Sequence, residues 1–360
     1  MSEWPDQRIL DLFKIDLPIV LAPMAGAGTP ELAVAVSEAG GLGSLACSQM
    51  TVGQARAALD LIRQRTSGSL NVNFFCHQPP PPNEAQLLAW HALLAPFYLE
   101  HDLDPELPDF SSTRVPFNAD FCSMVEDYAP AVVSFHFGLP EPSLLRRVRA
   151  TGAKVISSAT TVAEARWLMD RGCDAVIAMG LEAGGHRGNF LATDMARQIG
   201  TFALLPQIAD AVEVPVIAAG GVADARGILA AFALGAAAVQ IGTAYLFCPE
   251  ANLSPLYLRA LRTAADDETM ITNVFTGRPA RGIVNRLMRE LGPISSAVPT
   301  FPLASAALAS LRARAEGSGS GDFTNLWSGQ GARLARELPA ATLTRVLASE
   351  VLTKWRKASP

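Results

Sequence analysis

The stretch VPVIAAGGVADARGILAAFALGAAAVQIGT, residues 214–243, contains the pattern that decides the fold. An apolar run at residues 214–219 stops at two glycines, and a second apolar run occupies residues 237–241. Between the two runs, residues 223–234 carry apolar side chains at helical spacing. A strand, a helix and another strand in this order indicate neighbouring parallel strands of one sheet.

The same unit recurs along the first two thirds of the chain. Six further apolar runs precede it, at residues 18–22, 41–46, 70–75, 131–135, 154–158 and 175–178. Helical periodicity lies between most of them, at residues 31–38, 52–65, 162–170 and 202–211. Eight units with near-continuous apolar strands favour a closed barrel over an open doubly wound sheet. The sequence therefore predicts an α/β protein, a TIM (β/α)8 barrel with a smaller, mainly helical cap.

The remaining segments predict three additions to the barrel. We expect the barrel over residues 1–249, with an insertion at about 76–117 that contains a proline run and a helix near 84–98. Residues 250–321 predict a helical cap over the barrel mouth, ending in a Gly/Ser linker or mobile loop at 317–321. Residues 322–360 include a last helix, expected at about 331–355, that returns to the barrel.

Composition and charge exclude several classes of partner. The 360 residues carry a formal net charge of -5 with the charges interspersed, which argues against nucleic acid and anionic lipid as partners. No apolar run reaches the length of a membrane span, and the first residues do not resemble a signal peptide. Five scattered cysteines without metal-ligand spacing favour a cytoplasmic protein with no metal site. We expect a small-molecule ligand, and either a monomer or a homodimer.

Glycine loops after the last two strands indicate where a ligand binds. In this barrel, ligands bind at the carboxyl ends of the strands, and phosphate often binds after strands seven and eight. Gly221 follows strand seven, and Gln240, Ile241, Gly242 and Thr243 end strand eight. Glycine lets backbone N–H groups approach a phosphate closely, so these loops predict a phosphorylated ligand. The alternative is that the glycines serve only tight strand-to-helix turns.

The loop after strand six, MGLEAGGHRG at residues 179–188, has an active-site composition. We expect Glu182 and His186 to face a substrate pocket; the alternative is a solvated loop in which Glu182 pairs with Arg187. His136 follows strand four and is a candidate for acid–base chemistry, although a hydrogen-bonded core histidine would leave the same pattern. Met24 closes strand one, where it could support a flat ring or only pack in the core.

These segments together resemble the nitronate monooxygenase family, formerly called 2-nitropropane dioxygenases. The similarity runs from PIVLAPMAG at residue 18 through NVNF at 71, SFHFG at 134 and EAGGHRG at 182 to AGGV at 219, QIGT at 240 and WSGQ at 327. It implies a flavin mononucleotide (FMN) barrel that oxidises alkyl nitronates, and possible nitroalkane substrates, with O2 to a carbonyl compound and nitrite.

The resemblance also implies roles for single residues. Met24 and Asn73 would approach the flavin ring, Gly184 its ribityl or phosphate region, and His136 would be the catalytic histidine. Gly221 and residues 240–243 would hold the phosphate. The chain departs from the family at Met179, where a glutamine often stands beside the flavin. A protein of this kind uses the flavin for redox chemistry and its side chains for orientation and charge.

Other functions on this fold remain open. An FMN-dependent enoyl-acyl-carrier-protein reductase or an NADH:quinone-type oxidoreductase would share the glycine loops, although SFHFG argues against the reductase. A Schiff-base aldolase needs a lysine at the mouth, and the four lysines do not supply one. A dehydrogenase of the inosinate type needs a cysteine in residues 179–190, which contain none. A non-catalytic flavin-binding protein would carry the same binding motifs.

Overall fold

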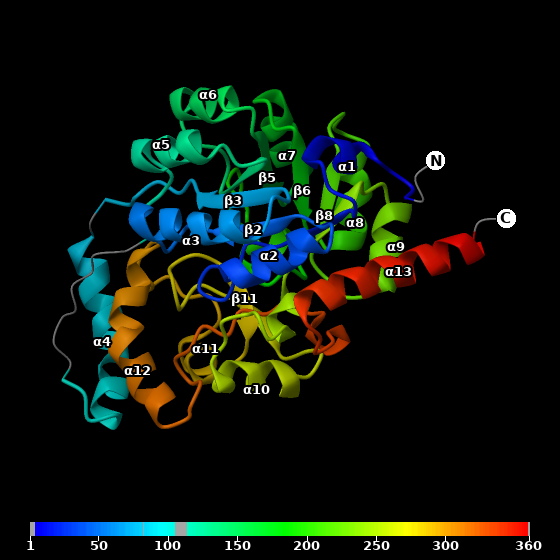
Figure 1. The fold of residues 1–360 in the computed structure, drawn as a ribbon. Coiled ribbons are helices and arrows are strands. Elements are labelled where there is room, and N and C mark those ends of the chain that lie inside the picture. The colour runs from blue at the N-terminus through cyan, green and yellow to red at the C-terminus, as the bar shows by residue number, and fades with distance from the viewer. Residues whose placement is uncertain (1–3, 82, 105–113, 359–360) are drawn as a thin grey trace.

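The computed structural model describes residues 4–81, 83–104 and 114–358, and shows eight parallel strands wound into a barrel with helices around it (Figure 1). The strands are β1 (Ile19–Leu21), β2 (Gly43–Ala46), β3 (Leu70–Phe75), β4 (Val132–His136), β5 (Lys154–Ala159), β6 (Ala175–Met179), β8 (Val216–Ala219) and β9 (Ala238–Ile241). Their order is β1-β9-β8-β6-β5-β4-β3-β2, and a parallel bridge between Val20 and Leu42 brings the two edges together. The predicted TIM barrel is confirmed.

Helices follow the strands as the barrel requires. They are α2 (Pro30–Glu38), α3 (Val52–Arg65), α5 (Ala119–Tyr128), α6 (Pro142–Ala150), α7 (Val162–Asp170), α8 (Thr201–Ala209) and α9 (Ala225–Ala233). Most begin at a side chain that accepts a hydrogen bond from a free N–H of the first turn, as Thr51 does for α3 in a capping box with Gln54. Their apolar faces and the outward side chains of the strands form the largest core.

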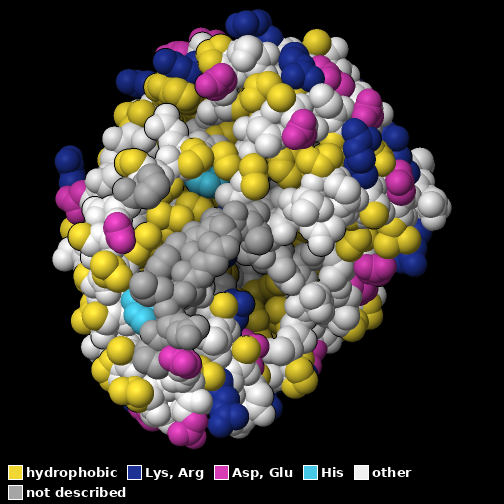
Figure 2. Space-filling model, turned by 90° about the vertical axis from the view of Figure 1, so that its left-hand side faces the viewer, with side chains coloured by type: hydrophobic (Ala, Val, Ile, Leu, Met, Phe, Trp, Pro, Cys, Tyr) yellow, Lys and Arg dark blue, Asp and Glu magenta, His cyan; other side chains and the backbone are white. Residues whose placement is uncertain are grey.

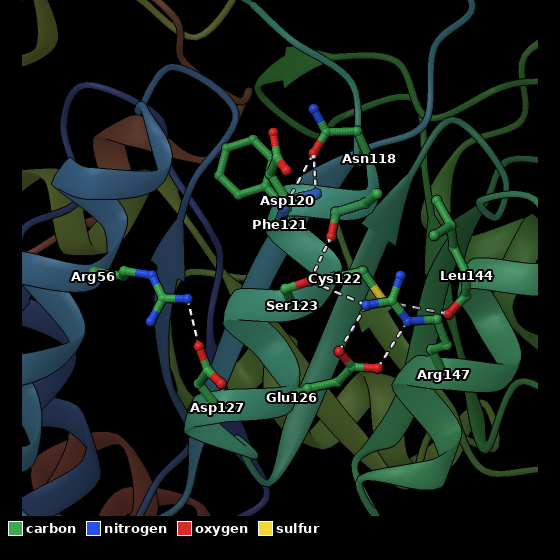
Figure 3. Close-up of polar contacts among 11 residues, drawn as sticks. Arg56, Asn118, Asp120, Phe121, Cys122, Ser123, Glu126, Asp127, Leu144 and Arg147 are labelled. Carbon is green, nitrogen blue, oxygen red and sulfur yellow. Dashed lines mark hydrogen bonds and ion pairs between the residues drawn. The ribbon is translucent and has the colours of Figure 1, made fainter.

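Polar contacts between neighbouring helices fix the outer layer beside β4 (Figure 3). The Asn118 side chain accepts hydrogen bonds from the first turn of α5. Arg147 of α6 donates to both carboxylate oxygens of Glu126 on α5, at 2.8 and 2.7 Å, and to Ser123. The Arg147–Glu126 pair is partly exposed, so it adds little free energy but sets the relation of the two helices.

The amino-terminal end of the barrel is closed by a short helix, α1 (Arg8–Phe13). Ile9 and Phe13 are buried against inward side chains of the strands, among them Val132, Ile156 and Ile217. The hydroxyl of Ser69, just before β3, donates to the Phe13 carbonyl at 2.5 Å. Alternate residues of each strand therefore fill the lower barrel with apolar side chains.

The rest of the chain packs on one side of the barrel (Figure 1). It comprises α4 (Glu84–Glu100) from the insertion, α10 (Pro255–Thr263), β10 (Thr269–Thr272), β11 (Ala280–Ile283), α11 (Arg286–Leu291) and α12 (Ala309–Gly317), with 3-10 turns Met195–Arg197, Thr243–Phe247, Leu303–Leu308 and Ala332–Leu334. Helices α4, α11 and α12 share a second core around Trp90 and Leu311, and α10 packs in a separate small cluster with Leu246 and Ile283. Figure 2 views the molecule from the left-hand side of Figure 1, where α4 and α12 lie, and shows a hollow lined partly by hydrophobic side chains.

One sequence expectation for this part was wrong in detail, and another stays a prediction. Residues 317–321 form the end of α12 and a turn in which the N–H groups of Ser318 and Ser320 donate to the Arg314 and Ala315 carbonyls, and the mobility expected of this Gly/Ser stretch stays a prediction. The last helix, α13 (Ala340–Ala358), begins after Pro339 and not near 331, because the preceding segment forms a separate 3-10 turn. It packs on α2 and α9. The division into barrel, cap and returning helix stays a prediction, and residues 82 and 105–113 of the insertion lie outside the described residues.

A small antiparallel sheet was not expected from the sequence. β7 (Gly185–His186), within the loop after β6, pairs with β11, and β11 pairs with β10. Ala280 lies opposite His186, and the Arg187 N–H donates to the Pro279 carbonyl at 2.8 Å. The pairing fixes the loop after β6 to a segment about a hundred residues later in the chain.

Candidate active site

A cavity of about 400 Å³ lies at the carboxyl ends of the barrel strands. Loops from the barrel line it, and so do residues of the later segments, including Asn252, Tyr257, Arg312 and Trp327. This volume lies in the range of small-molecule and cofactor pockets. In the described chain, no group of three histidine, cysteine or acidic side chains could hold a metal ion.

Two glycine loops form one end of the cavity. Gly220 and Gly221 have φ angles of +109° and +72°, which side chains other than glycine rarely adopt, and Gly242 and Thr243 follow β9. The Gly329 N–H donates to the Thr243 hydroxyl oxygen at 2.9 Å, so the hydroxyl proton of Thr243 is free to donate. The end of the cavity is therefore rich in backbone and hydroxyl donors, which suits a phosphate.

Gln240 is the polar side chain between these loops. Its Oε1 is buried and has no hydrogen-bond partner among the residues that the structure describes. A buried amide oxygen without a partner costs about 1–3 kcal/mol, so its retention in the cavity indicates a ligand donor. Adjacent Ile241, which we expected beside it, faces the other way: it is 1% exposed and packs in the core between strands and helices. Residues of a strand alternate in direction, so the Ile241 side chain points away from the cavity, and a role for its backbone in holding a phosphate stays a prediction.

His136 ends β4 and lines the cavity next to Ser158. Its Nδ1 lies 2.6 Å from the Ser158 hydroxyl, and its Nε2 lies 3.1 Å from the His186 carbonyl oxygen. Burial lowers the pKa of His136 to about 3, and the positive charges of Arg278 and Arg187 act in the same direction. The hydrogen bond to His186 opposes the shift only in part. The imidazole is therefore neutral near pH 7, which favours a base over a permanent cation.

The sequence of this chain matches a family model over nearly its whole length. The family model described as "Nitronate monooxygenase" matches residues 6–350. The protein belongs to the nitronate monooxygenase family. This is a family of oxidoreductases, and the match includes both the barrel and the later segments that help to line the cavity.

Individual relatives agree with this assignment. The chain is 42% identical to a nitronate monooxygenase of Pseudomonas aeruginosa, over 96% of this chain and 99% of that protein. It is 41% identical to one of Paraburkholderia phytofirmans, over 96% and 95%. A solved structure of nitroalkane oxidase from Streptomyces ansochromogenes has a TM-score of 0.89 at 38% identity, over 98% of this chain and all of that one. FabK from Thermotoga maritima has a TM-score of 0.72 at 30% identity, over 97% of both chains.

The cavity of the present protein brings together nearly all the residues that the sequence indicated as site residues. Beside His136, they are Met24, Asn73, Met179, Glu182, Gly184, His186, Gly221, Gln240, Gly242 and Thr243. Asn73 donates its amide to the Ser134 hydroxyl at 2.9 Å, which leaves the amide oxygen for a ligand. Met179 is 7% exposed and presents a thioether where a glutamine would offer an amide.

The loop after β6 is ordered by two separate sets of hydrogen bonds. The Glu182 carboxylate accepts from the Thr201 N–H at 2.8 and 2.9 Å and from its hydroxyl at 2.8 Å, so it caps the start of α8. Arg187 is fully buried and donates to the Met179 and Gly180 carbonyls and to Gln198. Glu182 and Arg187 are therefore not paired with each other, and both side chains hold the loop in place.

His186 lies on β7 between the cavity and a group of aromatic rings. Its Nε2 is 2.9 Å from the Thr276 hydroxyl, and the rings of Phe75, Phe301 and Trp327 surround it. Burial lowers its pKa well below the ordinary value, with Arg114 and neighbouring cations adding to the shift. His186 is therefore also neutral near pH 7.

The sequence analysis did not predict the basic side chains of the cavity or one further loop that adjoins it. Arg114 and Arg312 line the cavity, and Arg278 lies 3.8 Å from the centre of the Phe137 ring. Burial lowers the pKa of Arg114 and of Arg278 to about 10, so both remain cations near pH 7. Among the described lining residues Glu182 is the only acid, and the Thr201 hydrogen bonds occupy it.

The further loop lies between residues 327 and 331. The Gly329 N–H reaches Thr243, and the Gln330 N–H donates to the Glu182 carbonyl at 3.0 Å. An added Cβ at Gly184 would lie 2.5 Å from the Gly329 nitrogen, so these two loops touch backbone to backbone. The WSGQ motif signalled this contact only through the resemblance, since its distance along the chain hid its position.

Proposed function

We propose that this protein uses FMN to oxidise alkyl nitronates, and neutral nitroalkanes after loss of an α-proton, with O2 as the acceptor. The products would be a carbonyl compound and nitrite. The observation that carries the proposal is one cavity with two glycine loops, an unpartnered Gln240 oxygen and a neutral His136. Membership of the nitronate monooxygenase family supports the same reaction.

The residues of the cavity fit FMN. Gly221, Gly242, Thr243 and Gly184 would hold the phosphate and ribityl chain, where backbone and hydroxyl donors are close. Met24, Met179, Asn73 and Gln240 would adjoin the ring, with Gln240 supplying an acceptor that lacks a partner. Bound there, the flavin would supply the redox chemistry, taking electrons from the substrate and delivering them to O2.

The other side of the cavity suits an anionic substrate. Arg114 and Arg312 line it and Arg278 lies nearby, so its positive potential favours a nitronate over a neutral nitroalkane. For the neutral substrate, His136 and its partners would receive the α-proton. His186 and Trp327 would exclude water from the same space. Glu182 would act by holding the loop.

Purified protein tests this proposal through its spectrum. We expect a yellow protein that releases FMN, and not FAD, on denaturation. Adding a preformed alkyl nitronate without O2 should bleach the absorption, and admitting O2 should restore it with release of nitrite. An adenine-containing flavin would overturn the cofactor assignment, whereas an FMN protein that neither bleaches nor consumes O2 would support flavin binding without this reaction.

A cytoplasmic location is also proposed. All five cysteines are free, and Cys47, Cys122, Cys173 and Cys248 are buried. Free thiols in these numbers are typical of reducing compartments. None of the described helices has the length and apolar character needed to cross a bilayer. Fractionation of cells that express the protein would test the assignment.

A further inference from the structure

Both ring nitrogens of His136 already have protein partners. The Nε2 lies 3.1 Å from the His186 carbonyl, which can only accept, so Nε2 carries the proton. The lone pair of the neutral ring is then on Nδ1, which lies 2.6 Å from the Ser158 hydroxyl. In this tautomer Ser158 must be the donor. The imidazole therefore has no lone pair left for a direct contact with substrate.

Ser158 lines the ligand cavity beside His136. It is the last residue of β5 whose side chain faces the barrel interior, and it is 3% exposed. An added Cβ on Gly188 would lie 2.5 Å from Ser158 Oγ and 3.0 Å from His136 Cε1, so the backbone of Gly188 packs directly on the pair. Confinement of this kind holds the hydroxyl toward Nδ1.

The adjacent Ser157 provides a contrast. It is fully buried and donates to the Phe135 and Gly138 carbonyls at 3.0 and 2.9 Å. Its hydroxyl thus ties β5 to β4 and to the turn after it, and it does not line the cavity. Two serines in sequence therefore point to opposite faces of one strand, and only Ser158 adjoins the histidine.

We propose that Ser158 is a catalytic residue and that its oxygen receives the α-proton of a neutral nitroalkane, in a relay to His136. This inference rests on the proposed function. As the Cα–H bond breaks, its electron pair moves into the nitro group to form the nitronate. The proton joins Ser158 Oγ while the hydroxyl proton of Ser158 passes to His136 Nδ1, so no redox change occurs in this step.

The product of the relay is a His136 imidazolium whose two N–H groups both have hydrogen-bond acceptors in the protein. Its Nε2–H donates to the His186 carbonyl and its Nδ1–H to Ser158 Oγ, so both hydrogen bonds become charge-assisted. A preformed nitronate has no proton to give, and it would bypass both residues. The relay therefore predicts a selective defect.

The test compares Ser158→Ala with the matched control Ser157→Ala, using nitroethane and preformed ethyl nitronate at equal flavin content. Ser158→Ala should lower kcat/KM for nitroethane about 10²–10³-fold, within the usual range for acid–base catalysis, with the nitronate changed little. Deuteration of the nitroethane α-carbon should slow the variant at least as strongly as wild type. Ser157→Ala should leave the ratio of the two substrates unchanged, whatever it does to stability.

Two further experiments test the geometry of the pair, the first of them without a catalytic assay. Nitrogen-15 NMR of the His136 ring should show the Nε2–H tautomer near pH 7 and a shifted Nδ1 signal in Ser158→Ala only. Gly188→Ala, which keeps both side chains but displaces the hydroxyl, should reproduce the selective loss with nitroethane.

Equal losses with both substrates, an unchanged nitroethane rate in Ser158→Ala, or an Nδ1–H tautomer in wild type would overturn the relay. A wild-type protein that is inactive with ethyl nitronate would overturn the proposed function as well. If the wild-type protein oxidises ethyl nitronate but Ser158→Ala leaves the ratio of the two substrates unchanged, the relay would be overturned and the proposed function would stand.

Discussion

The two ends of the barrel interior are built from the same strands but are completed in different ways. At the amino-terminal end, Ile9 and Phe13 of α1 complete an apolar cluster in which side chains fill the space. At the carboxyl end there is a cavity of about 400 Å³, with an unpartnered Gln240 oxygen and two neutral histidines. The lower end contributes free energy of folding, and the upper end keeps a buried amide oxygen, that of Gln240, without a protein partner.

The largest expected effect is a loss of catalytic activity from a substitution at the upper end. His136→Asn keeps a compact polar side chain but removes the titratable ring, so oxidation of a neutral nitroalkane should fall about 10²–10⁴-fold. Preformed nitronate should be affected much less, because no proton has to be removed. The measurement is kcat/KM for both substrate forms at matched flavin content. Equal losses with both forms, together with poor flavin retention, would instead identify a histidine that serves the fold.

The next largest effect is a loss of stability from a substitution at the lower end alone. Ile156→Ala removes a fully buried side chain from the apolar cluster and should cost about 2–5 kcal/mol of unfolding free energy. Activity per bound flavin should be retained, since Ile156 does not line the cavity. Urea unfolding and flavin-normalised kinetics measure the two quantities. A change in substrate ratio would show that the two ends are coupled more closely than the packing indicates.

A smaller and opposite result is expected for Gln240→Leu at the upper end. The substitution removes a buried oxygen without a partner, so the flavin-free protein should be no less stable. Flavin affinity should fall by about 1–3 kcal/mol because the ligand loses its acceptor. Titration of flavin-free protein with FMN measures the affinity. If stability fell and affinity did not, Gln240 would belong to the packing of the barrel.

The same contrast explains what the sequence could predict. The eight strands were predictable because each is a short, near-continuous apolar run, and the glycines after β8 and β9 mark the mouth. The contact between His136 and Ser158 was within reach, since β4 and β5 are neighbours and both residues stand at or near strand ends. A comparison of strand ends, rather than of single residues, would have found it.

Other features could not be predicted, because they depend on contacts between distant parts of the chain. β7 has two residues and no periodicity, and its partner β11 begins at Ala280. Gly329 reaches Thr243 across 86 positions. The position of the cavity arginines could not be predicted for the same reason. Arg312 lies on α12, and only the packing of that helix brings its side chain to the cavity. Local pattern contains no information about such pairings.

The smallest expected effect per group is a pH dependence that originates at the upper end. Burial lowers the pKa of His77 to about 4 and of His136 to about 3, from an ordinary value of 6.5, and that of His186 well below it. The unfolded chain therefore binds protons near pH 5.5 that the folded chain does not. Stability is complete above pH 6.5 and is lost as the pH falls toward the folded pKa values.

Each such proton lowers the unfolding free energy by about 1.4 kcal/mol per pH unit, so three histidines should give a steep decline between pH 6.5 and 5. Lowered carboxyl pKa values, such as those of Glu100 and Glu126, act only below about pH 4.5 and do not enter this window. Urea unfolding at several pH values measures the slope, and His136→Asn should reduce it by about one proton. The lower end holds no titratable side chain in its cluster, so Ile156→Ala should lower stability at every pH and leave the slope as it is. A flat profile in wild type would mean that the histidines gain protons in the folded protein, and that the mouth of the barrel is wetter than its burial indicates.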